Sequence, residues 1–263
     1  MRFASMKAVL ALGCIALGLA ACATEPTDPN ELAAYREAND PLEPMNRYFF
    51  DLNNALDELV LKPFAGWYYI GLPNFAQDGI RNALNNLKTP VVLANDLFQG
   101  DLDRAGTTIG RFLINSTLGI AGLIDVASMF GLEYHTEDFG QTLAVWGADE
   151  GPYLVLPFVG PSNPRDASGR VVDHFLDPLT YLAWSHDWID TANYVRAGLD
   201  IVDTRARNLR ALDEIKAGAI DYYATIRSLY RQQRNDAITN GEAPAELSVL
   251  DYIDEEPQTT EAQ

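Results

Sequence analysis

The sequence of 263 residues carries 37 acidic and 19 basic residues, for a formal net charge of −18. Such a chain has little electrostatic attraction to nucleic acid or to anionic lipid headgroups, so we expect no nucleic-acid partner. The two cysteines lie close together near the N-terminus, and the length is sufficient for one large domain or two small ones without disulfides.

The N-terminus has the layout of a secretory signal. Arg2 and Lys7 give a positive start, residues 8–20 are small or aliphatic, and Leu19-Ala20-Ala21 leads into Cys22. This aliphatic-small-small-Cys box resembles the bacterial lipoprotein signal, in which the cysteine is acylated and becomes the first residue. We therefore predict a signal peptide over 1–21 and lipidation of Cys22. The alternative is a soluble secreted protein that is cut near Ala21.

A polar segment with two prolines, residues 22–38, is expected to form a flexible tether. The body that follows, residues 39–241, begins at Asp40-Pro41, which suits a helix start. Apolar residues then recur at three- and four-residue steps, which predicts an amphipathic helix that stops before Pro63.

Further helices are expected over 73–87 and 90–99, with Gly100 ending the second and Asp101 capping the next. The stretch 109–132 is apolar but contains charged residues and four glycines. A membrane-spanning helix would not normally hold such charges at its centre. We predict two short helices that meet at an angle near Gly119.

The second half of the body also favours helices. Acidic residues at the start of 137–147 suit a helix N-terminus. Prolines punctuate 151–162, which argues against a long helix or a central strand, and a polar loop follows over 163–169. The remaining helices are expected over 170–183, 188–209 and 213–239. The fold is therefore expected to be all-α, and 242–263, with seven acids and no basic residue, is expected to be an acidic disordered tail.

Catalytic and metal-binding patterns are weak in this chain. His135, His174 and His186 have no metal-ligand spacing, so we expect no metal site. No Gly-x-Ser-x-Gly elbow is present, although a hydrolase that uses His174 with Asp166 or Asp173 stays open as an alternative. The 12 tyrosines and 4 tryptophans suit either a membrane–water boundary or the core of a helical domain.

Three blocks of the sequence resemble the MlaA (VacJ) family of outer-membrane lipoproteins. The first block is Asn39-Asp40-Pro41-Leu42-Glu43-Pro44-Met45-Asn46-Arg47. The second runs from Phe98-Gln99-Gly100-Asp101 through 111–126, and the third from Glu137-Asp138-Phe139-Gly140-Gln141-Thr142-Leu143 to Arg165-Asp166. Together they extend over most of residues 39–240.

The resemblance implies a ring of helices in the inner leaflet of the outer membrane, with an amphipathic channel through its middle. It implies that phospholipid leaves the outer leaflet through this channel and passes to the periplasmic carrier MlaC, and that the chain associates with a trimeric porin. It implies no cofactor and no enzymatic activity. The rival hypotheses are a lipoprotein hydrolase acting on lipid or cell wall, and a purely structural porin-associated lipoprotein.

The resemblance also singles out residues for the site. Gly140, Gly147 and Gly151 are candidate joints of a loop that gates the channel, because glycine has wide conformational freedom; ordinary turn glycines are the alternative. Three arginines of the family-matching blocks are candidates for contact with a phospholipid headgroup: Arg47, Arg111 and Arg165. The alternative for them is ion pairing with nearby acidic residues.

Overall fold

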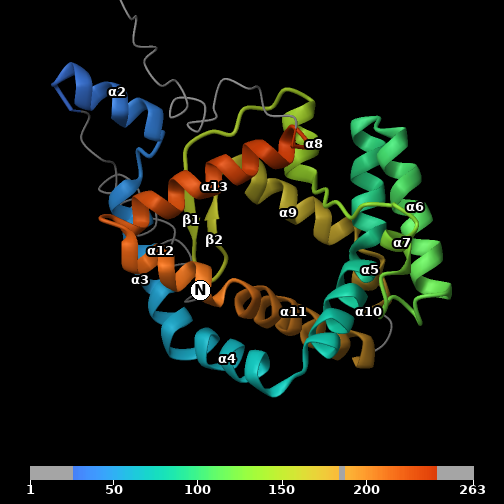
Figure 1. Cartoon of the computed structure of the whole chain (residues 1–263). Coiled ribbons are helices and arrows are strands. Elements are labelled where there is room, and N and C mark those ends of the chain that lie inside the picture. Colours follow the sequence, from blue (N-terminus) through green and yellow to red (C-terminus); the bar gives the residue numbers. More distant parts are fainter. Residues whose placement is uncertain (1–25, 184–186, 242–263) are drawn as a thin grey trace, which may run out of the picture.

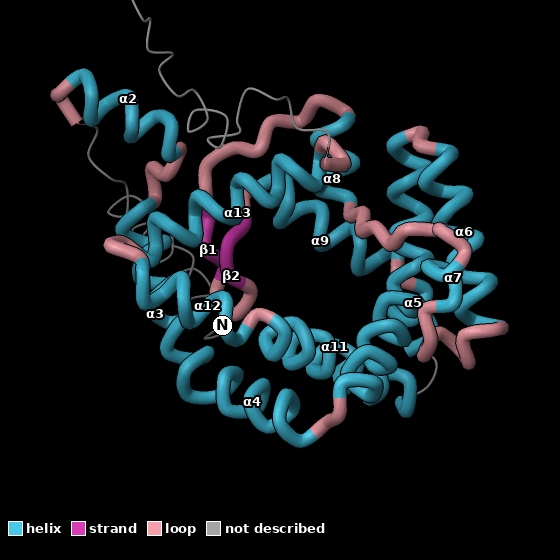
Figure 2. Tube along the Cα trace, in the orientation of Figure 1, coloured by secondary structure: helices cyan, strands magenta, loops and turns pink. Residues whose placement is uncertain are grey.

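The computed structural model describes residues 26–183 and 187–241. Its helices follow one another around a ring whose centre is open in the ribbon, as Figures 1 and 2 show. This arrangement confirms the predicted all-α, ring-like fold. The predicted signal peptide, the lipidation site Cys22 and the acidic tail lie outside the described residues.

The first arc of the ring consists of α2 (Pro29–Ala38), α3 (Glu43–Leu56), a π-helical turn η1 (Asp57–Leu61) and α4 (Lys62–Gly71). The sequence predicted a flexible tether over 22–38, but its second half is the helix α2. The predicted stop before Pro63 is also wrong. Pro63 lies in the first turn of α4, where its missing N–H is tolerated, because the preceding turn closes through the Lys62 N–H and the Asp57 carbonyl.

The next arc is an antiparallel pair, α5 (Asn74–Gln99) and α6 (Leu102–Thr117). Gly100, in the left-handed region at φ +78°, ends α5, and the Asp101 side chain accepts the Arg104 N–H, so both predicted caps are confirmed. The predicted helices 73–87 and 90–99 are instead one helix that contains Pro90. Proline removes one backbone hydrogen bond there, and side-chain bonds to α6 on both sides of it hold α5 continuous.

A tight turn follows α6, near the predicted angle. A Cβ on Gly119 would lie 2.5 Å from the Asn115 carbonyl oxygen, so only glycine fits this turn. The short helix α7 (Val126–Met129) comes next, and the Asp125 side chain accepts the Ser128 N–H at its start. The prediction of two helices with a break near Gly119 is therefore confirmed, although the first of them starts earlier, at Leu102.

Next in the chain come α8 (Phe139–Val145) and α9 (Pro164–Leu176), and a small hairpin that lies between them in the sequence packs beside α3 and α13. Its strands, β1 (Leu154–Leu156) and β2 (Gly160–Ser162), pair antiparallel with Val155 opposite Pro161. The hairpin is a correction to the strand-free fold predicted from sequence, since three-residue strands are too short to show an alternating pattern. The predicted polar loop 163–169 is also wrong, because Asn163 caps α9 and Pro164 begins it.

The ring closes through α10 (Pro178–Ala183), α11 (Asp187–Arg207), α12 (Leu209–Gly218) and α13 (Tyr222–Ile238). The single helix predicted over 213–239 is broken into α12 and α13, and the Asp221 side chain caps the second by accepting the Ala224 N–H. Helix α11 packs on the first arc, where Arg205 contacts Asp57 at 2.7 Å and the Tyr68 hydroxyl donates to Asp203. These contacts join α11 to the first arc of the body.

A small apolar core lies at this closure. It is formed by Tyr153, Val155 and Tyr223, with three further aromatic side chains packed against it: Phe49, Phe50 and Tyr230. The Tyr223 hydroxyl and the Arg227 guanidinium both donate to the carboxylate of Asp40. Asp40, at the start of the body, is thus held to α13, and this contact closes the ring.

Candidate functional site

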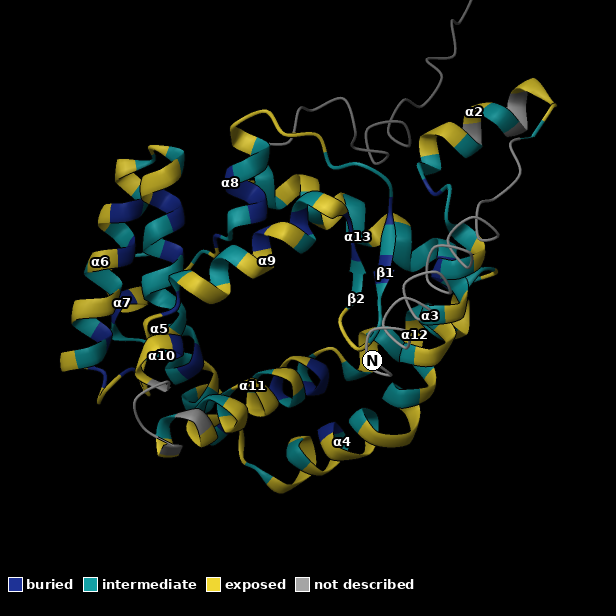
Figure 3. Cartoon of the chain, turned by 180° about the vertical axis from the view of Figure 1, so that it is seen from behind, coloured by how far each residue is buried: buried dark blue, intermediate teal, exposed yellow. Residues whose placement is uncertain are grey.

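The outer face of the ring carries large apolar side chains in contact with solvent. On α4, Trp67 is 69% exposed and Ile70 is 83% exposed, and Phe75 at the start of α5 is 79% exposed. Ile109, Phe112 and Leu113 are also exposed on α6. Figure 3 shows such exposed positions along α4 and α6. An apolar surface of this extent marks contact with a membrane or with another protein.

The face of α6 that meets α5 is polar. The Thr108 hydroxyl donates to the buried Asp96 carboxylate at 2.6 Å, and the Asn86 amide donates to the Ser116 hydroxyl at 2.9 Å. The His135 ring nitrogen lies 3.2 Å from the same Asp96 carboxylate. Helix α6 therefore turns its polar side chains inward and its apolar ones outward, the reverse of a helix in a water-soluble protein.

A second polar network joins α5 to α8 and α9. The fully buried Asn95 donates to the Asp173 carboxylate at 2.9 Å and accepts the Thr142 hydroxyl proton, also at 2.9 Å. Asp173 also accepts the Phe139 backbone N–H. Burial raises the pKa of Asp173, and these hydrogen bonds oppose that rise. The interior here is held together by hydrogen bonds rather than by apolar packing.

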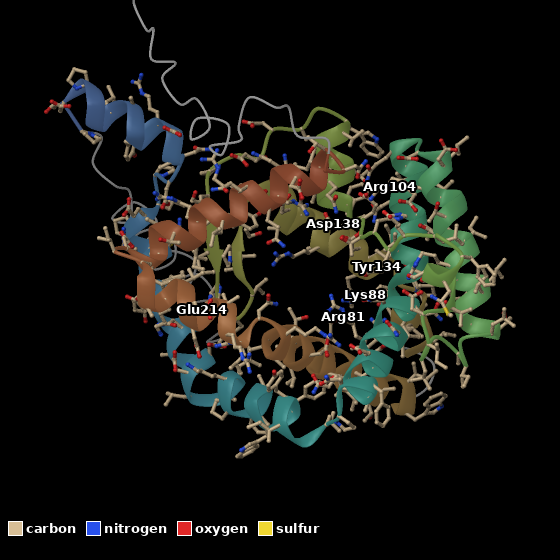
Figure 4. The ribbon with its side chains drawn as sticks, viewed as in Figure 1. Arg81, Lys88, Arg104, Tyr134, Asp138 and Glu214 are labelled. Atoms are coloured by element: carbon tan, nitrogen blue, oxygen red, sulfur yellow. The ribbon has the colours of Figure 1, made fainter. Side chains whose placement is uncertain are left out.

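The same region buries a further carboxylate, Glu137. Its two oxygens accept from the Arg104 guanidinium at 2.7 Å and the Gln99 amide at 2.8 Å. Burial raises the pKa of Glu137, and Gln99 and Arg104 act in the opposite direction. Figure 4 shows Arg104 on the arc opposite the hairpin, where α6 comes close to α8.

A cavity of about 180 Å³ lies between the inner face of α5 and the segment from α6 to the residues after α7. The residues that line it all have polar or charged side chains and include Arg81, Asn85, Arg111, Asp125 and Tyr134. Figure 4 shows Arg81 and the nearby Lys88 pointing from α5 toward the centre of the ring. The ring therefore exposes apolar side chains on α4 and α6, and a cavity lined by polar side chains lies beside its centre.

A family model described as MlaA lipoprotein matches residues 38–237. The chain belongs to the MlaA lipoprotein family. The match covers the whole ring from the end of α2 to the last turn of α13.

Named relatives in this family include the "Intermembrane phospholipid transport system lipoprotein MlaA" of Escherichia coli K12. It is 34% identical over 239 residues, which cover 88% of this chain and 90% of the relative. An uncharacterised protein of Rickettsia typhi is 37% identical over 207 residues, covering 77% of this chain and 79% of that protein. A solved structure described as "Structural basis for maintenance of bacterial outer membrane lipid asymmetry" is 34% identical, with a TM-score of 0.65, and covers 76% of this chain and 98% of its own.

The three arginines predicted from the MlaA resemblance all have acidic partners. Arg47 contacts Asp221 at 2.6 Å and Glu43 at 2.7 Å. Arg165 lies 3.2 Å from the carboxylate of the adjacent Asp166. The structure does not bring these two to the polar cavity.

Arg111 differs from the other two because it lines the cavity. It contacts Asp125 at 2.8 Å, and Asp125 also accepts from the Ser128 hydroxyl and the Asn115 amide. Burial acts to raise the pKa of Asp125, but the bonds to Ser128, Arg111 and Asn115 outweigh it and hold that pKa below its usual value. The charge of Arg111 is therefore neutralised within the protein, as the ion-pair alternative predicted.

The three predicted hinge glycines have different surroundings. Gly147 and Gly151 have φ values of +89° and +70°, in the left-handed region that glycine favours. Gly140 is buried inside α8, and a Cβ there would lie 2.8 Å from an Asp166 carboxylate oxygen. The hinge prediction is corrected for Gly140, which permits close packing of α8 on α9, while for Gly147 and Gly151 it stays a prediction.

The residues of the alternative hydrolase hypothesis do not assemble. Asp173 accepts hydrogen bonds from the Asn95 amide and the Phe139 N–H. Asp166 accepts from Asn163 and from Tyr230 and Arg234 of α13. No hydrogen bond joins His174 to either aspartate in the described residues.

The described part of the chain lacks two kinds of feature. Among residues 26–183 and 187–241, no group of three or more His, Cys, Asp or Glu residues is placed to hold a metal ion. Within the same ranges, no helix combines the length and the apolar character needed to cross a membrane.

Sequence reasoning missed the polar interior and Arg81. One signal could have revealed them. Asn82, Asn85 and Asn86 lie within four residues of each other in α5, although asparagine is a poor helix former. Such a run in a helix indicates side chains that are kept for their hydrogen bonds.

Proposed function

We propose that this chain is an outer-membrane lipoprotein that removes phospholipid from the outer leaflet and passes it toward the periplasm. The observation that carries the proposal is the combination of apolar side chains exposed on α4 and α6 with a cavity lined by polar side chains beside the ring centre, in a member of the MlaA family. The naming of the E. coli relative as a phospholipid transport lipoprotein supports it.

The physical argument rests on what a phospholipid needs along its route. Each CH₂ of an acyl chain costs about 0.8 kcal/mol to expose to water, so unaided escape from a bilayer is slow. Its charged headgroup is in turn expensive to move through hydrocarbon. A closed ring held in lipid lowers both costs at once, because its wall shields the tails from water while its polar groups bind the headgroup. The route through the ring centre is the channel of this proposal.

We place the ring in the inner leaflet of the outer membrane, tethered by an acyl group on Cys22. Exposed Trp67, Ile70 and Phe112 would then lie among lipid tails instead of water. The partners in this proposal are a trimeric porin, which fixes the ring in the membrane, and the soluble periplasmic carrier MlaC, which accepts the lipid. Gly147 and Gly151 are proposed to hinge the loop after α8 and so gate the route.

This proposal includes no covalent chemistry by the chain itself. Its support is that Asp166 and Asp173 are occupied in structural hydrogen bonds. A lipid-acting hydrolase would instead need one of them to orient a histidine beside a nucleophile.

The test is a deletion strain assayed for phospholipid in the outer leaflet, with complementation by the wild-type chain and by the Cys22→Ser variant. We expect deletion to raise outer-leaflet phospholipid, the wild-type chain to restore the normal level and the variant to restore less. Unchanged outer-leaflet phospholipid on deletion would support the purely structural alternative. Release of free fatty acid or lysophospholipid by the purified chain would support the hydrolase.

A further inference from the structure

One basic side chain in the polar cavity has no acidic partner. Among the described residues, Arg81 of α5 forms no ion pair, whereas its neighbours on the ring interior do. Lys88, two turns further along α5, contacts Asp200 at 2.7 Å, and Arg111 contacts Asp125. In a chain with a net charge of −18, an arginine left unpaired beside a cavity is unusual.

The cavity as a whole is therefore positively charged. Its ionised lining residues are Arg81, Arg111 and Asp125, and the last two neutralise each other. The guanidinium of Arg81 supplies the remaining charge. An arginine presents paired N–H donors that match the geometry of a phosphate group.

Further donors stand beside Arg81 without partners. Asn85, four residues later on the same face of α5, has a side-chain amide with no hydrogen bond among the described residues. The Tyr134 hydroxyl, from the segment after α7, also lines the cavity without one, while the Arg111 guanidinium lies over its ring at 5.4 Å. Three free donors from two segments thus line one cavity, and Figure 4 labels two of them, Arg81 and Tyr134.

The size of the cavity limits what can enter it. Its volume of about 180 Å³ is below that of a pocket for a drug-sized ligand, which is roughly 300 Å³ or more. A phosphate with a small substituent fits, but an acyl chain does not. An acyl chain in this space would also leave the donors of Arg81, Asn85 and Tyr134 without partners, so the tails of a bound lipid would have to stay outside, toward the ring centre.

We infer that the cavity formed by Arg81, Asn85 and Tyr134 binds the phosphate of a phospholipid headgroup while its acyl chains remain in the ring centre. This inference rests on the proposed transport function and assigns it a specific binding site. Arg81 supplies the charge, and Asn85 and Tyr134 supply hydrogen bonds. The site differs from the predicted one, because Arg47 and Arg165 do not line this cavity and Arg111 is neutralised.

The test measures the dissociation constants of three probes with the purified full chain by calorimetry in detergent. The probes are dihexanoylphosphatidylethanolamine, dihexanoylglycerol, which lacks the phosphate, and inorganic phosphate. The variants are Arg81→Gln and Tyr134→Phe, and the matched control is Arg210→Gln, which removes the same charge from the exposed face of α12.

We expect Arg81→Gln to weaken binding of the phospholipid about tenfold, since hydrogen bonds to charged groups are among the strongest polar contacts. Tyr134→Phe should weaken it by a smaller factor. Binding of dihexanoylglycerol should change by less than about twofold in both variants, and Arg210→Gln should bind all probes as the wild type does. Because the Arg81 side chain is exposed, Arg81→Gln should not shift the midpoint of unfolding.

Phospholipid binding that is unaffected by Arg81→Gln would overturn the site but leave the transport function intact. Inorganic phosphate that binds as tightly as the phospholipid, with the same dependence on Arg81, would overturn the lipid assignment in favour of a free anion. A wild-type chain that binds no phospholipid would overturn the site, and the proposed function would fail with it if deletion also left outer-leaflet phospholipid unchanged.

Discussion

The contact between α8 and α9 gives the sharpest prediction about stability. Gly169 of α9 lies against Gly140 of α8, and a Cβ added to Gly169 would be 2.7 Å from the Gly140 Cα. The nearest atoms are backbone, so no side chain can rotate away and the two helices must separate. We therefore expect Gly169→Ala to destabilise the ring.

The magnitude follows from two opposing terms. Overpacking of a close contact costs about 1–3 kcal/mol, and backbone neighbours place this site at the upper end. Replacing a helical glycine by alanine returns about 1 kcal/mol of helix propensity. The net loss in the free energy of unfolding is therefore about 2 kcal/mol. The same exchange at Gly198, a helical glycine of α11 with open space around it, should stabilise by about 0.5–1 kcal/mol.

The assay is urea unfolding of the purified full chain, followed by the helical circular dichroism signal, for the wild type, Gly169→Ala and Gly198→Ala. Opposite shifts of the two midpoints are expected. Equal midpoints for Gly169→Ala and the wild type would refute the packing argument, and with it the reassignment of Gly140 from hinge to packing position.

Three further predictions concern charge and exposure. Arg234→Met should lower the free energy of unfolding by about 3 kcal/mol, because it removes the ion pairs of Arg234 with Asp138 at 2.6 Å and with the buried Asp166 at 2.8 Å, and Asp166 keeps only the longer ion pair with Arg165. A loss below about 1 kcal/mol in urea unfolding would contradict this. Arg47 lowers the pKa of Asp221 to about 2. The ion pair therefore stabilises the fold above about pH 4, and this stabilisation is lost as pH falls toward 2. The difference in urea-unfolding midpoint between the wild type and Asp221→Asn should therefore shrink from pH 5 to pH 2.5. A difference that stays constant over this range would argue against a stabilising ion pair. Trp67→Ser, at an exposed position, should change the free energy of unfolding by less than about 0.5 kcal/mol. In the unacylated Cys22→Ser chain it should nevertheless weaken binding to lipid vesicles, and unchanged binding would place Trp67 outside the membrane contact.

Much of the fold follows from local sequence signals. Gly100 and Asp101 mark the turn between α5 and α6, and Asp138 caps α8, because caps depend on a few adjacent residues. Two of the errors fall at prolines. Pro63 was expected to end a helix and Pro90 to begin a new one, but both helices continue through them, where a π turn or packing against α6 compensates for the lost hydrogen bond.

The candidate site was less accessible to sequence reasoning. Hydrophobic periodicity marks one apolar face of a helix but does not say whether that face points to a core or to a membrane. In α6 the answer depends on the contact between Thr108 and Asp96, which are far from adjacent in sequence. Arg81 stands out only once the partners of Lys88 and Arg111 are known, because an isolated arginine on a helix has no distinctive pattern.

The central claim is that phospholipid passes through the polar interior of the ring, and blocking that interior tests it most directly. Asn85→Cys places a thiol on the cavity wall, and Leu113→Cys places one on the exposed outer face of α6. Each variant is labelled with a bulky maleimide and assayed for clearance of phospholipid from the outer leaflet. Passage through the ring predicts that labelling at position 85 stops clearance and labelling at position 113 does not. Clearance that continues at the wild-type rate with position 85 fully labelled would contradict it.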